Sequence, residues 1–176
     1  MKKITVIIAA LSALFLTSCS SGLKGFNGIK FNSGNESASR ELVNQGWTID
    51  SSKSLPSAED SEEGTIYSLY FTGNDLSSSF MGLPAEGIQL SFYKDKMVVG
   101  IADIKADIED QDILAALQTM VTESKLKNED GSTIEQVEFD KPYFDKKGHV
   151  TYATKNDFGN KMIVVAVAKS PLRIMQ

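Results

Sequence analysis

The stretch GIQLSFYKDKMVVGIADI, residues 87–104, decides how this chain of 176 residues folds. It contains two strand-forming runs, residues 87–93 and 97–104, separated only by Lys94-Asp95-Lys96. A connection this short predicts a hairpin. Parallel pairing of the two runs would need a crossover of about a dozen residues. The chain is therefore expected to form an antiparallel sheet.

Further strand signals extend this sheet on both sides of the hairpin. They fall at residues 47–50, 65–72, 133–139, 148–154 and 161–169. The last run contains MIVVAVA, residues 162–168, which is apolar on both faces. Such a strand belongs in the interior of a sheet. We expect about six to seven strands in all.

Two helices are expected beside the strands. In the first, Ser33 and Glu36 have capping-box spacing, and Gly46 stands where a helix would end. Trp47, just beyond it, is interpreted as a core anchor that packs back onto this helix. The second helix, residues 107–127, carries one apolar stripe of Ile113, Leu114, Leu117, Met120 and Val121. Helices of this kind predict an α+β two-layer sandwich, a mainly antiparallel sheet with both helices on one face.

The N-terminus has the features of a secretory signal peptide. Met1-Lys2-Lys3 is cationic, and the apolar run from residue 4 to residue 16 follows it. This run is shorter than the roughly 20 apolar residues that a membrane-spanning helix needs. Small residues follow the run, as a signal peptidase requires, so we expect cleavage and export.

The segment Leu16-Thr17-Ser18-Cys19 resembles the lipobox of bacterial lipoproteins, and Cys19 is the only cysteine of the chain. The resemblance implies cleavage after residue 18, a diacylglyceryl thioether on Cys19 and an acyl chain such as palmitate on its amino group. Such a protein is held to the membrane of the bacterial cell envelope, outside the cytoplasm, on the periplasmic or cell-surface face. More than one acyl chain makes a stable anchor. The alternative is an incidental or buried cysteine after an ordinary leader.

The sequence therefore predicts three segments: a leader of residues 1–18, a lipidated and flexible tether of residues 19–34, and one α+β domain of residues 35–176. The tether is expected to be flexible because it contains Gly22, Gly25, Gly28 and Gly34 and has no sustained periodicity. Phe26, Ile29 and Phe31 alternate, however, and an added edge strand remains open.

The charge of the chain excludes one class of partner. Lys and Arg total 18 against 23 acidic residues, a net charge of -5. Removal of residues 1–18 takes away two lysines, so the mature charge is 16 - 23 = -7. Binding to nucleic acid is not expected, because it depends on lysine and arginine neutralising phosphates. The lipid, rather than a basic patch, is expected to hold the protein to the membrane.

No catalytic or metal-binding pattern stands out, and we expect neither an enzyme nor a cofactor. His149 is the only histidine and is interpreted as an exposed residue at a strand end. One histidine without a free cysteine does not fill a zinc ligand set. The acidic run at residues 59–63 lacks the ligand spacing of a calcium loop.

The best candidate site is the long, apolar connection at residues 74–86. Leu76, Phe80, Met81 and Leu83 could form a deformable surface for an envelope protein or an apolar ligand. Alternatively, these side chains cap one end of the core. The preferred function is a non-catalytic binding module, and the alternative is a structural or assembly lipoprotein that meets its partner through a sheet edge.

The order of the expected elements is also similar to that of small periplasmic domains of the PepSY and beta-lactamase-inhibitor-protein types. This resemblance carries no motif residues across, and such folds serve unrelated functions.

Overall fold

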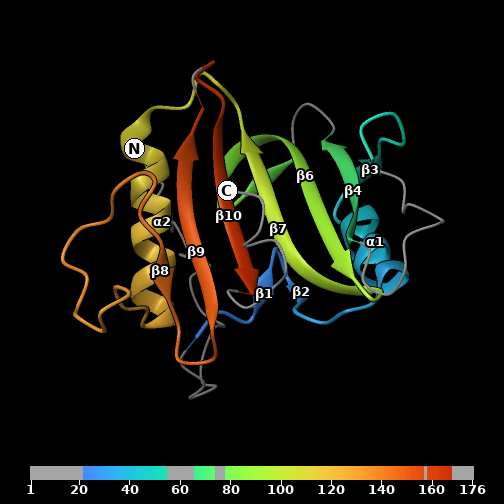
Figure 1. Ribbon diagram of the computed structural model, residues 1–176. Coiled ribbons are helices and arrows are strands. Elements are labelled where there is room, and N and C mark those ends of the chain that lie inside the picture. The colour runs from blue at the N-terminus through green and yellow to red at the C-terminus, as the bar shows by residue number, and fades with distance from the viewer. Residues whose placement is uncertain (1–21, 55–65, 74–77, 157, 168–176) are drawn as a thin grey trace, which may run out of the picture.

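The computed structural model describes residues 22–54, 66–73, 78–156 and 158–167. Within them, helices α1 (Asn35–Asn44) and α2 (Asp110–Ser124) accompany one large antiparallel sheet and a separate two-stranded hairpin (Figure 1). The expected α+β class with a mainly antiparallel sheet is confirmed. None of the helices in these residues is long and apolar enough to cross a bilayer.

The large sheet has eight strands, where about six to seven were expected. In spatial order these are β3 (Trp47–Ile49), β4 (Ile66–Gly73), β6 (Leu83–Tyr93), β7 (Lys96–Ile104), β10 (Lys161–Val167), β9 (His149–Lys155) and β8 (Tyr143–Phe144), with β5 (Ser79–Phe80) paired to β6. The β6–β7 hairpin is confirmed. The strand that is apolar on both faces, β10, lies between β7 and β9, as its composition predicts.

One expected strand, residues 133–139, is absent from the described sheet apart from a single bridge between Phe139 and Ala153. The backbone N–H of Val137 donates to the side chain of Gln118 on α2, at 3.1 Å. The N–H of Glu138 donates to the hydroxyl of Tyr143, at 2.8 Å. Side chains therefore satisfy backbone donors that a strand would pair with a neighbour, and the segment crosses α2.

Helix α1 begins one residue later than the capping box predicts. Its N-cap is Gly34, which offers no side-chain bond. The carboxylate of Asp95, on the β6–β7 turn, accepts from the N–H of Asn35 at 3.3 Å. A residue distant in sequence thus takes the role assigned to Ser33. The end is as expected, because Gly46 follows the helix with a φ of 90° and Trp47 is buried.

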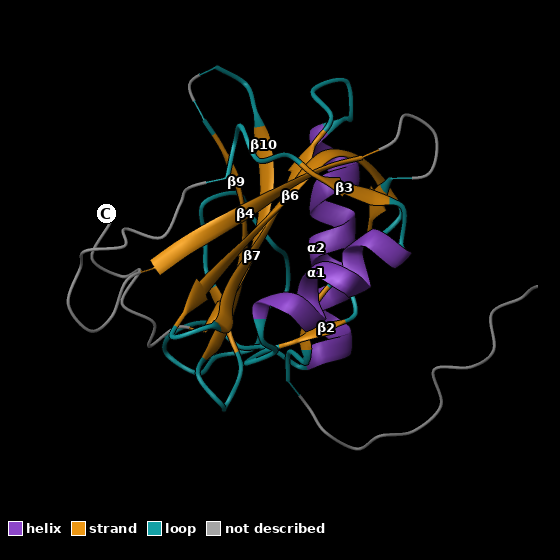
Figure 2. Ribbon diagram, turned by 90° about the vertical axis from the view of Figure 1, so that its right-hand side faces the viewer, coloured by secondary structure: helices purple, strands orange, loops and turns teal. Residues whose placement is uncertain are grey.

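The main core lies between the helices and one face of the sheet. Buried side chains of α1 and α2 meet alternate residues of the strands, which are Phe71, Ile88, Leu90, Phe92, Met97, Ala102, Ile104, Ala153, Ile163 and Val165. Figure 2 shows α1 and α2 on the same side of the sheet. Successive strand residues point to opposite faces, so the intervening residues form a second surface.

Residues 22–34, expected to be a flexible tether, are part of the core instead. Strands β1 (Gly25–Phe26) and β2 (Ile29–Lys30) pair with each other around Asn27-Gly28, so the alternative of an edge strand is also wrong. Phe26 is 1% exposed and its ring lies against Gly100, where an added Cβ would be 2.1 Å from the ring. The glycines of this segment suggested flexibility, but Gly28 lies in the tight turn between β1 and β2. Gly100 on β7 leaves room for the Phe26 ring.

Candidate functional site

Residues 79–84, the described part of the partner-binding loop proposed from the sequence that contains Phe80, Met81 and Leu83, form a tight hairpin. Phe80 is 2% exposed and stacks on Phe26, with ring centroids 4.6 Å apart. Leu83 is half-buried and packs against the core. Met81 is exposed at the tip, with a φ of 54°. Phe80 and Leu83 therefore cap the core, which was the alternative interpretation, whereas Leu76 and Cys19 lie outside the described residues.

A second apolar cluster lies on the sheet face turned away from the helices, which we call the outer face, and its central residues are buried. Its centre consists of Val98 and Val99 of β7 and Val164 of β10, at 5–7% exposure. Half-buried residues surround them, namely Tyr93, Ile101, Tyr152 and Ala166. A bulge in the β6–β7 pairing, next to Ser91, adds Val98 to this cluster beside Val99. The outer face is thus apolar across the four neighbouring strands β6, β7, β10 and β9.

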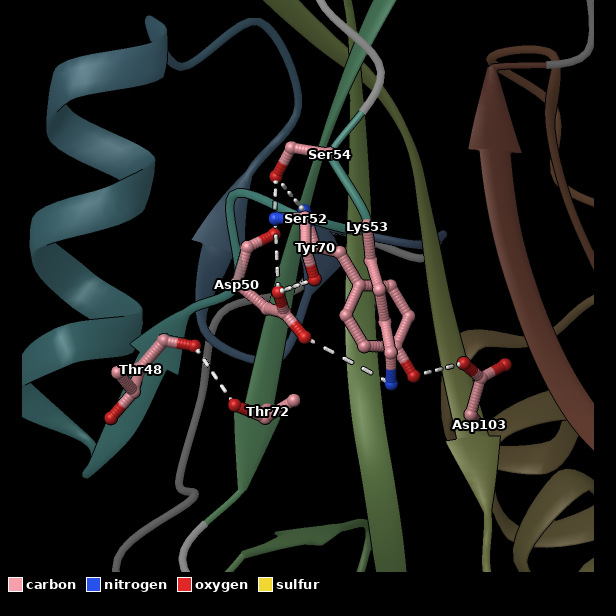
Figure 3. Close-up of polar contacts among 8 residues, drawn as sticks. All are labelled: Thr48, Asp50, Ser52, Lys53, Ser54, Tyr70, Thr72 and Asp103. Carbon is pink, nitrogen blue, oxygen red and sulfur yellow. Dashed lines mark hydrogen bonds and ion pairs between the residues drawn. The ribbon is translucent and has the colours of Figure 1, made fainter.

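A polar group of residues borders this apolar centre on the β4 side (Figure 3). The hydroxyl of Tyr70 on β4 donates to Oδ2 of Asp103 on β7, at 2.6 Å. Its ring crosses β6 at Gly87, where an added Cβ would lie 2.1 Å from the hydroxyl oxygen. Gly87 therefore creates the gap that lets Tyr70 span from one strand to the next but one.

Two charged residues, Lys53 and Asp50, lie beside the Tyr70 ring. The Nζ of Lys53 lies 4.8 Å from the centre of that ring, a cation–π contact. Asp50 is 4.0 Å from the same Nζ and accepts from the hydroxyl of Ser52 at 2.6 Å. The bond from Ser52 is the main cause that lowers the pKa of Asp50. The Asp50 carboxylate therefore stays ionised at neutral pH.

Tyr70 itself stays protonated. Burial, followed by its hydrogen bond to Asp103, raises the pKa of the Tyr70 hydroxyl well above its usual range. A neutral phenol that already donates to a carboxylate is a poor nucleophile and a poor base. The arrangement brings together an aromatic ring, charged groups and adjoining aliphatic side chains, which a binding partner could contact.

The lone histidine is also tied into the structure. His149 has a side chain only 16% exposed, so the expectation of an exposed residue is wrong. Its ring stacks on Phe31, with centroids 4.3 Å apart, and its Nδ1 lies 2.8 Å from Oδ2 of Asp145. The N-terminal segment, folded onto the core, supplies Phe31 and thereby covers the ring.

Asp145 serves three segments at once. Its carboxylate accepts from the backbone N–H groups of Leu23, Lys147 and His149 at 2.8–3.0 Å, besides its contact with the His149 ring. Burial alone would raise the pKa of Asp145, but the bonds from His149 and Lys147 outweigh it and the pKa is lowered. The hydrogen bonds of the Asp145 carboxylate therefore stabilise the fold.

Within residues 22–54, 66–73, 78–156 and 158–167, no cluster of three or more histidine, cysteine, aspartate or glutamate side chains could hold a metal ion. A hollow of about 450 Å³ lies at the end of α2 beside Gly22 and Asp145. Its lining includes Val121, Leu126 and Ile134 as well as Lys125, Lys127 and Lys146, and Tyr70 is not among its residues.

The sequence did not reveal the cluster on the outer face, because the register between strands decides which side chains lie next to each other. The alternation at residues 66–73 and 97–104 places Tyr70 and Ile101 away from the core face, and the sequence alone is sufficient to predict this. The contact between Tyr70 and Asp103 depends on the β4–β6–β7 order and on Gly87 lying under the ring. A glycine in a strand was the available signal for a close approach.

Comparisons with known proteins add no relative: no family model, no curated protein and no solved structure matches this chain.

Proposed function

We propose that this chain is a non-catalytic, lipid-anchored protein of the bacterial cell envelope, whose domain binds a protein partner on the outer face. The observation that carries the proposal is the composition of that face, where half-buried apolar side chains surround the buried valines and Tyr70, Lys53 and Asp103 lie at the border. Protein interfaces share this arrangement of an apolar centre with an aromatic and polar rim.

The anchor is proposed from the leader. Residues 16–19 resemble a lipobox, and the apolar run before them is too short to span a bilayer. With its only thiol consumed by lipid at Cys19, the mature chain would have no free cysteine for chemistry. The histidine is engaged with Asp145 and Phe31. Both points favour binding over catalysis.

A second candidate is contact through the sheet edge formed by β3 and β4. Ile49 on β3 is 44% exposed, and β3 pairs only with residues 71–73 of β4. Strand addition at this edge would supply backbone hydrogen bonds to a partner. The edge strands β3 and β8 are only three and two residues long, however, and short edge strands discourage such pairing. The outer face is therefore preferred.

Site-specific photocrosslinking in cells of the native host tests the two candidates. A photoreactive residue replaces Ile101 on the outer face, Ile49 on the edge, or Val43 on α1, which is exposed on the helix side. We expect a discrete adduct from position 101 and none from position 43. An adduct from position 49 alone would support the edge, and an adduct from position 43 alone, or from no position, would contradict both.

Position 80 is unsuited to such a test. Phe80 is part of the core, so its substitution would change the fold together with any binding surface. Met81 is the matched probe of the hairpin tip: Met81→Ser should leave the adduct at position 101 unchanged. Loss of the adduct in this variant would move the binding surface to the hairpin.

A further inference from the structure

The chain enters the domain at a defined place. The N–H of Gly22 donates to the carbonyl oxygen of Ser124, at the end of α2, at 2.9 Å. The N–H of Leu23 donates to Oδ2 of Asp145, on the turn before β9, at 3.0 Å. These two bonds fix where the polypeptide arrives from residue 19.

Exposed lysines surround this entry point. Lys125 directly follows Ser124, Lys146 and Lys147 directly follow Asp145, and Lys24 follows Leu23. Lys125 and Lys146 line the same hollow as Gly22. We call these four residues the lysine-rich end. In Figure 1 the end of α2, the turn before β9 and strands β1 and β2 all lie at the lower edge of the molecule.

The acidic residues near the entry point offset this charge only in part. The side chain of Asp145 is 2% exposed, and its carboxylate accepts hydrogen bonds from the backbone N–H groups of Leu23 and His149. Glu123 is exposed on the last turn of α2, and Glu129 and Asp130 lie on the loop that follows. Lys125, Lys127 and Lys146 line the hollow beside Gly22 together with Asp145, whereas Glu129 and Asp130 line a second hollow together with Lys141.

The opposite end of α2 carries the larger acidic group. Asp107, Glu109, Asp110 and Asp112 gather at its start, about 22 Å away along a helix of fifteen residues. Lys155 and Lys161 pair with Asp110 there. The domain is therefore polarised along α2, with its basic groups where the chain enters. The net charge of -7 conceals this asymmetry.

The distance to Cys19 is short. Two residues lie between Cys19 and Gly22, and an extended chain spans at most about 3.6 Å per residue, so the three steps from one Cα to the other reach roughly 11 Å. The Debye length at physiological salt is about 8 Å. We propose that the lysine-rich end docks on anionic phospholipid headgroups of the membrane that holds the anchor, and so orients the domain. This inference rests on the lipidation of Cys19 under the proposed function.

Docking of this kind assigns different tasks to lipid and protein. The acyl chains hold the chain in the membrane, whereas the lysines select the side of the domain that faces it. Each lysine near an anionic surface strengthens binding roughly fivefold. The acidic start of α2 is repelled by the same surface and turns toward solvent.

The test uses the full lipidated chain in vesicles, with one added cysteine as a spin-label site. Since Cys19 carries lipid, a cysteine at Glu123→Cys or at Asp107→Cys takes the label alone, and each change removes one exposed acid. The vesicles are phosphatidylcholine with or without phosphatidylglycerol. We expect the label at position 123 to be shielded from a water-soluble paramagnetic chelate only with phosphatidylglycerol, and to be released by high salt. The label at position 107 should stay accessible throughout.

Two triple variants show which lysines matter. Lys125→Gln, Lys146→Gln and Lys147→Gln together should shift the docked equilibrium by on the order of 100-fold. The control, Arg40→Gln, Lys105→Gln and Lys155→Gln, removes the same charge away from the entry point and should leave docking unchanged. Equal loss in both variants would contradict the inference, because it would reflect net charge alone.

Intact mass of the same preparation separates the two proposals. A chain without lipid at Cys19 would contradict the proposed function and remove the reason for docking. A lipidated chain whose label at position 123 is equally accessible in both kinds of vesicle would contradict the docking alone.

Discussion

At the scale of single residues, Asp145 connects more of the molecule than any other polar side chain described above. It holds the N-terminal segment through Leu23, the turn through Lys147 and the ring of His149. Asp145→Asn should lower the free energy of unfolding by about 1–3 kcal/mol, because a neutral amide leaves buried donors poorly satisfied. Urea denaturation at pH 7 measures this change. An unchanged midpoint would show that the carboxylate is dispensable.

The same residue predicts a pH dependence with a definite sign. Because the pKa of Asp145 is lowered from its ordinary value of 3.8, the unfolded chain binds its proton more readily than the folded one. Its contribution is complete above about pH 4 and is lost as the pH falls below that value. The difference in stability between wild type and Asp145→Asn should therefore shrink in acid. A difference that grows below pH 4 would contradict this assignment.

Gly87 is the second residue whose role is local and testable. A Cβ at this position would lie 2.1 Å from the Tyr70 hydroxyl oxygen. Gly87→Ala should destabilise the domain by about 1–3 kcal/mol, because the Tyr70 ring has to leave its site. Adding Tyr70→Ala should recover part of this loss, which thermal unfolding of the double-mutant cycle would measure. Strictly additive effects would mean that the two residues do not interact.

At the scale of elements, the β5–β6 hairpin separates core from surface within two residues. Phe80→Ala should cost about 3–5 kcal/mol, because a buried aromatic ring stacked on Phe26 is removed. Met81→Asn should be neutral or slightly stabilising, because Met81 has a φ of 54° and asparagine before Gly82 suits such a turn. Chemical denaturation of both variants tests this contrast. Similar losses would place Met81 in the core as well.

Local patterns predicted the elements well where a single segment decides its own structure. The β6–β7 hairpin, α2 and the interior position of β10 follow from a short connection, an apolar stripe and a run without polar residues. The predictions were wrong where residues distant in sequence supply the hydrogen bonds that determine local structure. Asp95 supplies the bond at the start of α1, and Gln118 and Tyr143 take backbone donors of residues 137–138.

The candidate site shows the same division. Alternation within β4 and β7 indicates which side chains share a face, but not which of them meet. The Tyr70–Asp103 contact requires the order of three strands and the gap at Gly87. Residues 22–34 illustrate the converse error. Their glycines suggested a tether, although Phe26 fills the space that Gly100 leaves on β7.

At the scale of the whole molecule, the two proposals assign a role to each side of the domain. The lysine-rich end would face the lipid surface, and the outer face, which runs along the strands, would contact a protein partner. The polarity of α2, acidic at its start and followed by lysine at its end, agrees with this orientation. Both roles depend on a lipid at residue 19.

Intact-mass spectrometry of the chain purified from membranes of its native host tests that dependence most directly. We expect a mature protein that starts at Cys19, lacks residues 1–18 and carries the mass of a diacylglyceryl group plus an acyl chain. A chain that retains its leader, or one that starts at another residue with an unmodified cysteine, would contradict it.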